Sequence, residues 1–234
     1  MKILAIIPAY NEEENIELLL NKLKMSRVDV LVINDNSIDS TSEICKRHAV
    51  NVIDLPCNLG IGGAVQTGYK YAKNNNYEIA IQVDGDGQHD PRFIDVLIEP
   101  LINGKADMVI GSRYINKNGF QSTYIRRIGI RYFSLLIKQL TRKGITDPTS
   151  GFRACNSKVI NEFSMKYPVD YPEPESIVYL LRKNYRVAEI PVIMKERIGG
   201  VSSIGAIRSV YYMIKVTLAI FIDILRGREK SEVL

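Results

Sequence analysis

Residues 79–90 read IAIQVDGDGQHD, a short apolar run that ends in a polar, glycine-rich cluster. The same order occurs three times before it. Apolar runs at residues 3–7, 28–33 and 51–55 precede polar clusters at residues 8–12, 34–39 and 58–63. Because the runs are continuously apolar and helical patterns separate them, they are typical of parallel strands covered on both faces. Such sheets bind ligands beyond the carboxyl ends of their strands. The sequence therefore predicts an α/β fold whose polar clusters meet at one edge.

The rest of the chain extends this pattern. Apolar residues at helical spacing predict helices at residues 12–23, 40–48, 62–74 and 92–101, and a further apolar run predicts a strand at 108–110. Beyond residue 124 we expect helices at 125–141, 175–183 and 204–226, a loop at 147–153 and a strand at 187–194. No repeat or linker divides the chain. We therefore expect one catalytic domain over residues 1–203 and a helical appendage over residues 204–234.

Composition excludes a disordered chain and a small scaffold held by disulfides. The 234 residues are 46% hydrophobic and 24% charged, enough to bury a sizeable core without a structural metal. The three cysteines, Cys45, Cys57 and Cys155, lack metal-ligand spacing, and the first residues do not resemble a secretory signal peptide. We expect a protein of a reducing, cytosolic environment.

The net charge of +5 is unevenly distributed. Residues 1–112 have 10 Lys and Arg against 16 Asp and Glu, a net −6, whereas residues 113–158 have 10 against 1, a net +9. A concentrated basic block can face nucleic acid, an anionic membrane or a phosphorylated ligand. The acidic first half argues against a general nucleic-acid partner.

The cluster after residue 83 is a candidate metal site. Asp84 and Asp86 lie one residue apart at the predicted end of a strand, each beside a glycine, and Gln88 adds a neutral oxygen. Hard oxygen ligands of this kind suit Mg²⁺ or Mn²⁺ held together with substrate phosphates. The alternative is a solvated acidic turn that caps the next helix.

The glycines of residues 58–68 fit a dinucleotide fingerprint poorly. That fingerprint follows the first strand of its fold, but this loop follows the third, and its last glycine is displaced. Two interpretations stay open: close approach of the backbone to a ligand, or packing of a helix on the sheet.

Six ordered motifs together resemble a known family. They are Pro8-Ala9-Tyr10-Asn11-Glu12, Asn34-Asp35-Asn36-Ser37 with Asp39, Asn58 with Gly60, Asp84-Gly85-Asp86 with Gln88-His89, Gly111-Ser112-Arg113-Tyr114, and the DPTSGFR stretch from Asp147 to Arg153. In this order they are similar to the inverting glycosyltransferases of family 2, which have the GT-A (Rossmann-like) fold. The branch they resemble most is that of polyprenyl-phosphate sugar synthases such as dolichol-phosphate mannose synthase. The resemblance covers residues 3–203.

The resemblance implies a site for a nucleotide-sugar donor. Its binding residues would be Pro8, Ala9, Tyr10, Asn11, Glu12, Asp35, Asn58, Gly60, Asp84, Gly85 and Asp86. Asp86 and Gln88 would ligate Mg²⁺ or Mn²⁺, with Asp84 beside the sugar nucleotide. The usual pattern has Asp-Asp-Gly-Ser where this chain has Asn34-Asp35-Asn36-Ser37. The departure leaves uracil or guanine open as the base; we favour a UDP-sugar, with GDP-mannose as the alternative.

The basic block would then meet the acceptor. The resemblance implies that Arg113, Arg131 and Arg197 are ligands of a polyprenyl (undecaprenyl) phosphate, a role that suits arginine because a planar guanidinium binds phosphate oxygens in pairs. For Arg126, Arg127, Lys138, Arg142 and Lys143 we favour a solvated or membrane-facing helix face. A phosphate acceptor needs no general base. A hydroxyl acceptor on a lipid-linked glycan would need a general base, and Glu175 is the candidate for it. The alternative role of Glu175 is that of an acidic residue that stabilises the start of a helix.

The last helical pattern predicts a membrane or partner contact. Its longest uncharged stretch, residues 216–222, is too short to span a bilayer. Its wide apolar face suits attachment at the inner face of the cell membrane, recruitment by a small membrane subunit or self-association, and the alternative is packing on the catalytic core. We expect a cytoplasmic enzyme, peripherally attached to the membrane, that transfers sugars for the assembly of cell-envelope polysaccharide or glycan. A non-catalytic sugar-nucleotide-binding subunit is the remaining alternative.

Overall fold

The computed structural model describes residues 1–195 and 206–225. The sheet strands are β1 (Ile3–Ala9), β2 (Asp29–Asn34), β3 (Asn51–Asp54), β4 (Ile79–Gln82), β5 (Met108–Ser112), β6 (Arg153–Asn156) and β7 (Val187–Pro191). The helices are α1 (Ile16–Leu23), α2 (Thr41–Arg47), α3 (Gly60–Asn74), α4 (Ile94–Ile102), α5 (Tyr124–Thr141), α6 (Ser157–Met165), α7 (Pro172–Arg182) and α8 (Ala206–Leu225), with a 3₁₀ turn, η1, at Pro91–Phe93.

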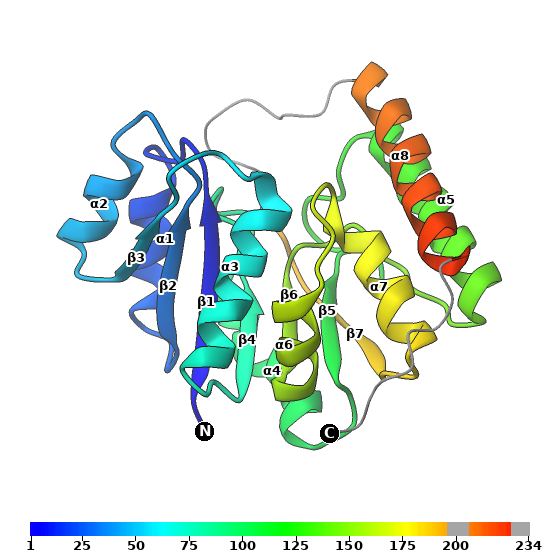
Figure 1. The fold of residues 1–234 in the computed structure, drawn as a ribbon, viewed down its shortest axis with the longest axis horizontal. Coiled ribbons are helices and arrows are strands. Elements are labelled where there is room, and N and C mark those ends of the chain that lie inside the picture. The colour runs from blue at the N-terminus through cyan, green and yellow to red at the C-terminus, as the bar shows by residue number, and fades with distance from the viewer. Residues whose placement is uncertain (196–205, 226–234) are drawn as a thin grey trace.

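One mixed sheet organises the molecule (Figure 1). Its strand order is β3-β2-β1-β4-β6-β5-β7, and every pair is parallel except those that β6 makes with β4 and β5. The predicted α/β fold is therefore confirmed. The sequence did not predict β6 or α6, because residues 147–153 have the proline and glycine of a loop and β6 begins with a charged arginine.

Helices cover both faces of the sheet, and each layer has its own core. Helices α1, α2 and α4 bury one set of aliphatic side chains against one face. Helices α3, α5, α6, α7 and α8 cover the other face, where Tyr69, Phe133 and Phe163 are completely buried. The strands run between these layers toward a single edge, so the loops that follow β1, β2, β3 and β4 lie near one another.

Two glycines of α3 settle part of the question about residues 58–68. A Cβ atom at Gly62 would lie 2.2 Å from the carbonyl oxygens of Pro168 and Val169, and one at Gly68 would lie 2.2 Å from Ile6. These glycines serve close packing of the helix against the sheet and the 168–169 backbone. Gly60 begins the helix with a φ of +74°, a conformation that glycine adopts without strain.

The C-terminal helix α8 lies beside α5 and α7 (Figure 1). Val216 and Ile220 are buried in the core that these helices share. A hydrogen bond of 2.9 Å joins the hydroxyls of Tyr132 and Thr217, and Lys166 pairs with Asp223 at 2.8 Å. The helix therefore packs on the catalytic core along one side. Within the described residues, no helix is long and apolar enough to cross a membrane.

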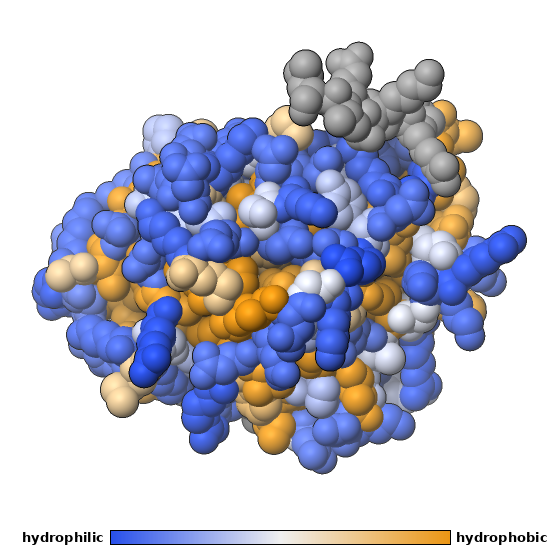
Figure 2. Space-filling view, turned by 90° about the horizontal axis from the view of Figure 1, so that it is seen from below, coloured by the Kyte–Doolittle hydropathy of each residue, from blue (hydrophilic) through white to orange (hydrophobic). Residues whose placement is uncertain are grey.

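The other side of α8 is exposed and apolar. Its exposed side chains are Tyr211, Ile214, Leu218, Phe221, Ile222 and Leu225, and those of neighbouring α5 are Tyr124, Ile128, Tyr132 and Leu135. We call these ten side chains the α5/α8 apolar face. Figure 2 views the opposite end of the sheet, where its parallel strands begin; most of that surface is hydrophilic, with hydrophobic residues near its centre and on the side where α5 and α8 lie.

Candidate active site

The loop after β4 is held rigidly at the edge of the sheet. The backbone N–H of Asp84 donates to Nδ1 of His89 at 3.0 Å, and the buried His89 ring stacks on Phe152 with 4.9 Å between centroids. Gln82 Nε2 donates to Oδ1 of Asp84 at 3.1 Å. The backbone N–H of Gln88 donates to Oδ1 of Asp86 at 3.0 Å. His89 is therefore a structural residue of the turn, and it orients Asp84.

The donor set of this loop fits a divalent cation. A Cβ atom at Gly151 would lie 2.7 Å from Oδ2 of Asp84, so only glycine leaves room for that carboxylate. In the described part of the chain, no group of three or more His, Cys, Asp or Glu side chains could hold a metal. Two carboxylates and an amide oxygen instead match the way Mg²⁺ is held together with substrate phosphates. Asp84, Asp86 and Gln88 are thus the residues that would hold it.

The loops after β1, β2 and β3 are joined around Asp35. This side chain is 4% exposed, and its Oδ1 accepts from the backbone N–H of Leu59 at 2.7 Å. The Asp35 N–H donates to the carbonyl of Ala9, and Asn58 donates to the carbonyl of Asp35. Asn11, with a φ of +53°, links the first loop to the second through Ser37 and Ile38.

These loops also contact the metal loop. A Cβ atom at Gly85 would lie 3.1 Å from the carbonyl oxygen of Pro8 and 3.4 Å from Cγ of Glu12. Tyr10 is half exposed at this edge. The structure therefore brings together the expected donor residues, namely Pro8, Ala9, Tyr10, Asn11, Glu12, Asp35, Asn58, Gly60, Asp84, Gly85 and Asp86.

Asn34, the departure from the family pattern, has a structural partner. Its Nδ2 donates to Oδ1 of Asp54 at 2.8 Å, and the two residues face each other across β2 and β3. Lys46, Ser42 and Asn34 all donate to that carboxylate, and together they lower the pKa of Asp54 to about 2. An amide here can donate to Asp54, whereas an ionised acid cannot.

Arg113 is engaged by an internal partner. Its guanidinium binds Asp147 through Nε at 2.7 Å and Nη2 at 2.8 Å, and Asp147 is fully buried. Burial opposes the charge of Arg113, but the hydrogen bonds that it donates to Asp147 raise its pKa above the ordinary value. Glu189 in turn accepts from the backbone N–H groups of Thr146 and Asp147. Arg113 thus ties β5 to the 146–150 loop, and its role toward an acceptor phosphate stays a prediction.

The structure gives less information on the other two expected phosphate ligands, Arg131 and Arg197. Arg131 is exposed on α5, beyond the first turns of that helix. Arg126 and Arg127 lie close enough to Tyr114 to lower its pKa, although burial raises that pKa overall. The first turn of α5 thus lies within electrostatic reach of Tyr114, the residue after Arg113. Arg197 lies outside the described residues.

Two glutamates of α7 face different surroundings. The pKa of Glu175 is raised by burial and by Asp223, and Lys166 opposes the shift. The charged groups that act on it, Asp223 of α8 and Lys166 after α6, form an ion pair with each other. Burial raises the pKa of Glu173, the positive charge of Arg153 lowers it, and the negative charge of Asp84 raises it; the net shift is upward. Sequence reasoning missed Glu173; its spacing from Ser176, three residues on, places both on one helix face.

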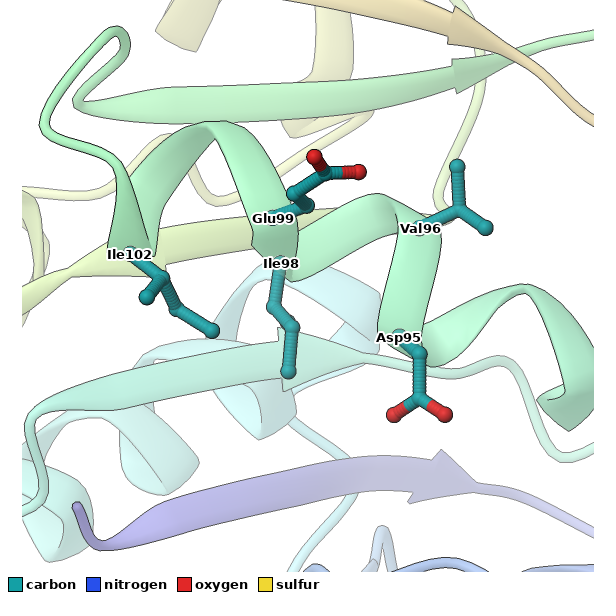
Figure 3. Close-up of a pocket in the computed structure, with 5 residues that line it drawn as sticks. All are labelled: Asp95, Val96, Ile98, Glu99 and Ile102. Carbon is teal, nitrogen blue, oxygen red and sulfur yellow. The ribbon is translucent and has the colours of Figure 1, made fainter.

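A separate pocket lies on α4, away from these loops. It is lined by Asp95, Val96, Ile98, Glu99 and Ile102. All five side chains come from one helix, and Figure 3 shows Val96 and Glu99 on the opposite side of it from Asp95. None of the expected site residues lines it, so the pocket is not part of the candidate active site.

Comparison with known proteins gives one consistent family. Residues 4–163 match the model of glycosyl transferase family 2. A UDP-N-acetylglucosamine–dolichyl-phosphate N-acetylglucosaminyltransferase from Methanococcus voltae is 30% identical over 208 residues, which are 80% of this chain and 83% of that protein. A polyprenol monophosphomannose synthase from Mycolicibacterium smegmatis is 28% identical over 220 residues, 86% of this chain and 80% of that protein.

A solved structure supports the fold. The glucosyl-3-phosphoglycerate synthase of Mycobacterium tuberculosis, in complex with Mn²⁺, UDP and glucosyl-3-phosphoglycerate, superposes with a TM-score of 0.74 at 16% identity, over 100% of this chain and 83% of that chain. The likeness confirms the expected GT-A fold. Given the matched family model, the ordered motifs and the shared fold, the chain belongs to glycosyl transferase family 2.

Proposed function

We propose that this protein transfers a sugar from a UDP-sugar to a polyprenyl phosphate, with Mg²⁺ or Mn²⁺ as cofactor. The observation that carries the proposal is the joining of four loops at one sheet edge, where Asp35, Asp84 and Asp86 lie together beside a basic segment. The names of the two relatives support a polyprenyl-type phosphate acceptor, and one of them names a UDP-sugar.

The proposed reaction needs no proton transfer. An oxygen of the lipid phosphate attacks the anomeric carbon, the bond from that carbon to the diphosphate breaks, and its electron pair leaves on the nucleoside diphosphate. One displacement of this kind inverts the anomeric carbon. The cation, when bound, neutralises charge that develops on the leaving diphosphate. The arginines Arg113, Arg131 and Arg197 are proposed to hold the acceptor phosphate.

The α5/α8 apolar face supports work at a membrane surface. Its exposed aliphatic and aromatic side chains adjoin the basic residues of α5, a combination that binds the interface of an anionic bilayer without spanning it. We place the enzyme at the inner face of the cell membrane, in cell-envelope glycan assembly. A small membrane subunit or a second copy on this face is the alternative partner, and no nucleic acid is expected.

The test is a lipid-extraction assay. The protein is incubated with undecaprenyl phosphate, Mn²⁺ or Mg²⁺ and a panel of radiolabelled nucleotide sugars, and label is counted in the solvent phase. We expect label from one UDP-sugar, lost on chelation and in Asp86→Asn but kept in Asp95→Asn, which removes the same charge on α4. Absence of metal-dependent label with every donor would contradict the proposal.

A variant at Glu175 separates the two kinds of acceptor. Glu175→Gln should cost an enzyme that uses a hydroxyl acceptor orders of magnitude in kcat, because the general base is lost. An enzyme that uses a phosphate acceptor should lose much less. The neighbours of Glu175, which are Lys166, Asp170 and Asp223, support the phosphate acceptor.

A further inference from the structure

The inference concerns the loop at residues 146–151, which touches two parts of the candidate active site. A Cβ atom at its Gly151 would lie 2.7 Å from Oδ2 of Asp84, so this end of the loop packs against the loop after β4. Near its other end, Asp147 is fully buried and binds the guanidinium of Arg113. The loop therefore joins Arg113, an expected ligand of the acceptor phosphate, to the expected cation site.

One edge of the Arg113 guanidinium is held by this loop, and the rest of it is open. Nε and Nη2 donate to the two carboxylate oxygens of Asp147, and Nη2 also donates to Oγ1 of Thr149 at 3.2 Å. Within the part of the chain that the structure describes, Nη1 has no hydrogen-bond partner, and it is not one of the buried atoms that lack a partner. Because Nη1 has two N–H groups, both are left for a ligand.

Glu189 anchors the start of the loop from β7, which pairs in parallel with β5. Its Oε2 accepts from the backbone N–H of Thr146 at 2.7 Å. Its Oε1 accepts from the backbone N–H of Asp147 at 2.9 Å and from Oγ1 of Thr146 at 3.0 Å. The Thr146 hydroxyl also lies 2.6 Å from that of Ser112, the residue before Arg113. Both carboxylate oxygens of Glu189 therefore fix the backbone that presents Asp147.

This anchor depends on two acceptor oxygens. Burial raises the pKa of Glu189, and the hydrogen bonds from Thr146 and Asp147 lower it; the net shift is upward. A carboxylate accepts at both oxygens, whereas an amide has one acceptor oxygen and one NH₂ donor. Glu189→Gln would therefore set a donor against a backbone N–H, and one of the bonds to the loop would be lost.

The far end of the loop has separate support. Oγ of Ser150 donates to the carbonyl of Gly111 at 2.7 Å, and the backbone N–H of Gly111 donates to the carbonyl of Phe152 at 2.8 Å. These bonds flank the residue that packs against the loop after β4. Loss of the Glu189 anchor should therefore displace Asp147 without disturbing the expected cation site.

We propose that Glu189 is a positioning residue for the acceptor site: it holds Asp147 against one edge of Arg113, so that Nη1 is presented to the acceptor phosphate. Glu189 acts through these two residues and not on the reacting atoms. This inference rests on the proposed function, because it takes Arg113 as a ligand of that phosphate.

The experiment separates acceptor binding from donor binding. Farnesyl phosphate, a short polyprenyl phosphate, is titrated calorimetrically into the full chain with saturating UDP and Mg²⁺, and KM and kcat are measured with undecaprenyl phosphate. Glu189→Gln should raise the Kd for farnesyl phosphate and the KM for undecaprenyl phosphate by about five- to tenfold. The affinity for UDP with Mg²⁺ should change by less than about twofold.

Two further variants distinguish positioning from a general loss of stability. Asp107→Asn removes hydrogen bonds at the opposite end of β5 and should leave the Kd for farnesyl phosphate within about twofold. Arg113→Lys keeps a charge for Asp147 but has no second edge for a phosphate, so it should weaken acceptor binding by itself. Adding Glu189→Gln to Arg113→Lys should then weaken it by less than about a further twofold, because both changes affect one contact.

The outcomes separate this inference from the proposed function. If the unchanged protein neither binds farnesyl phosphate nor labels undecaprenyl phosphate, the phosphate acceptor is wrong. If it does both and a folded Glu189→Gln binds farnesyl phosphate equally well, only the inference is overturned. An equal loss in Asp107→Asn, or fully additive losses in the double variant, overturns it too. Glu189→Ala, which sets no donor against the loop, replaces Glu189→Gln if that variant does not fold.

Discussion

Asn34 illustrates how a single atom can matter at this edge. The amide of Asn34, where the family pattern that the sequence resembles has an acid, donates to Asp54 across two strands. The carboxylate of Asp54 is thereby held by three donors. The exchange of an acid for an amide therefore changes the support of the donor loop without removing Asp35, which contacts the third loop.

Replacing Asn34 with aspartate should destabilise the protein. The variant Asn34→Asp places two carboxylates face to face and removes the hydrogen bond, at a cost of about 1–2 kcal/mol in the free energy of unfolding. Urea unfolding at neutral pH measures this cost. Asn51→Asp, at an exposed position of β3, is the matched control and should change the free energy by less than about 0.5 kcal/mol. Equal stability of the two variants would contradict the argument.

An ion pair between exposed Arg186 and buried Asp107, at the other end of the sheet, predicts acid sensitivity. Hydrogen bonds from Arg186 lower the pKa of Asp107 to about 2, although burial opposes the shift. Because the pKa of this group is about 3.9 in an unfolded chain, its stabilisation is present above about pH 4 and is lost as the pH falls toward 2.

Unfolding measured between pH 5 and pH 2 tests this expectation. The part of the pH dependence that belongs to Asp107 should amount to about 1–2 kcal/mol and should disappear in Asp107→Asn. Arg186→Gln leaves the carboxylate in place but removes the guanidinium, so it should flatten the same part of the curve. A curve for Asp107→Asn as steep as that of the unchanged protein would exclude this source of acid sensitivity.

At the scale of elements, α8 has two faces with different tasks. Val216 and Ile220 are 1% exposed within the core, whereas Leu218, between them, is 56% exposed on the α5/α8 apolar face. The helix is thus anchored along one stripe and presents the other. Core packing and the proposed membrane contact are therefore not alternatives for this helix.

A substitution on the outer stripe should separate the two tasks. Leu218→Gln should lower binding to vesicles that contain phosphatidylglycerol several-fold while leaving the free energy of unfolding within about 0.5 kcal/mol. Ile102→Gln on α4 is the matched control, since Ile102 is 53% exposed, and it should keep vesicle binding. Flotation through a sucrose gradient measures both. Equal flotation of Leu218→Gln and the unchanged protein would exclude this face from membrane contact.

The elements that the sequence predicted well share a physical origin. The runs that became β1, β2 and β4 are mostly apolar and buried, so their order follows from local pattern, whereas β3 is a partly exposed strand at the edge of the sheet. The polar clusters after these four strands lie at the shared edge. Strand β6 escaped prediction because its tertiary partners define it: Arg153 is tolerated in the sheet only because Ser150, Pro148 and Ser176 accept from it.

Candidate site residues divide in the same way. Those that lie directly after a strand, such as Asp35 and Asp84, could be placed from sequence. Residues whose surroundings come from distant segments could not. Glu173 and Glu175 have different charged neighbours because they lie on different sides of α7, and the sequence does not show how that helix is oriented on the sheet. The binding of Arg113 to Asp147 depends on the loop between α5 and β6, which returns to the end of β5.

For the whole molecule, the distribution of charge sets the behaviour at surfaces. An acidic first half with a net −6 adjoins a segment with a net +9. The basic segment includes α5, which borders the exposed apolar side of α8. Attraction to an anionic surface should therefore orient the molecule with its acidic half away from the lipid.

The salt dependence of vesicle binding tests this orientation. Raising the salt concentration from about 0.05 to about 0.5 M should weaken binding to anionic vesicles strongly, because the Debye length falls below the spacing of surface charges. Binding to neutral vesicles should be weak at both concentrations. Salt-independent binding to anionic vesicles would mean that apolar contact alone holds the protein there.

The antiparallel strand β6 also sets an order in time. Strand β5 pairs only with β6 and β7 in the described sheet, and residues 113–152 are made between β5 and β6. At 5–20 residues per second, a ribosome needs about 2–8 s to make that segment. During this interval β1 to β4 can already pair with one another, whereas the apolar β5 has no strand to pair with because β6 and β7 have not yet been made. The growing chain thus has a period of several seconds in which chaperone contact with β5 competes with folding.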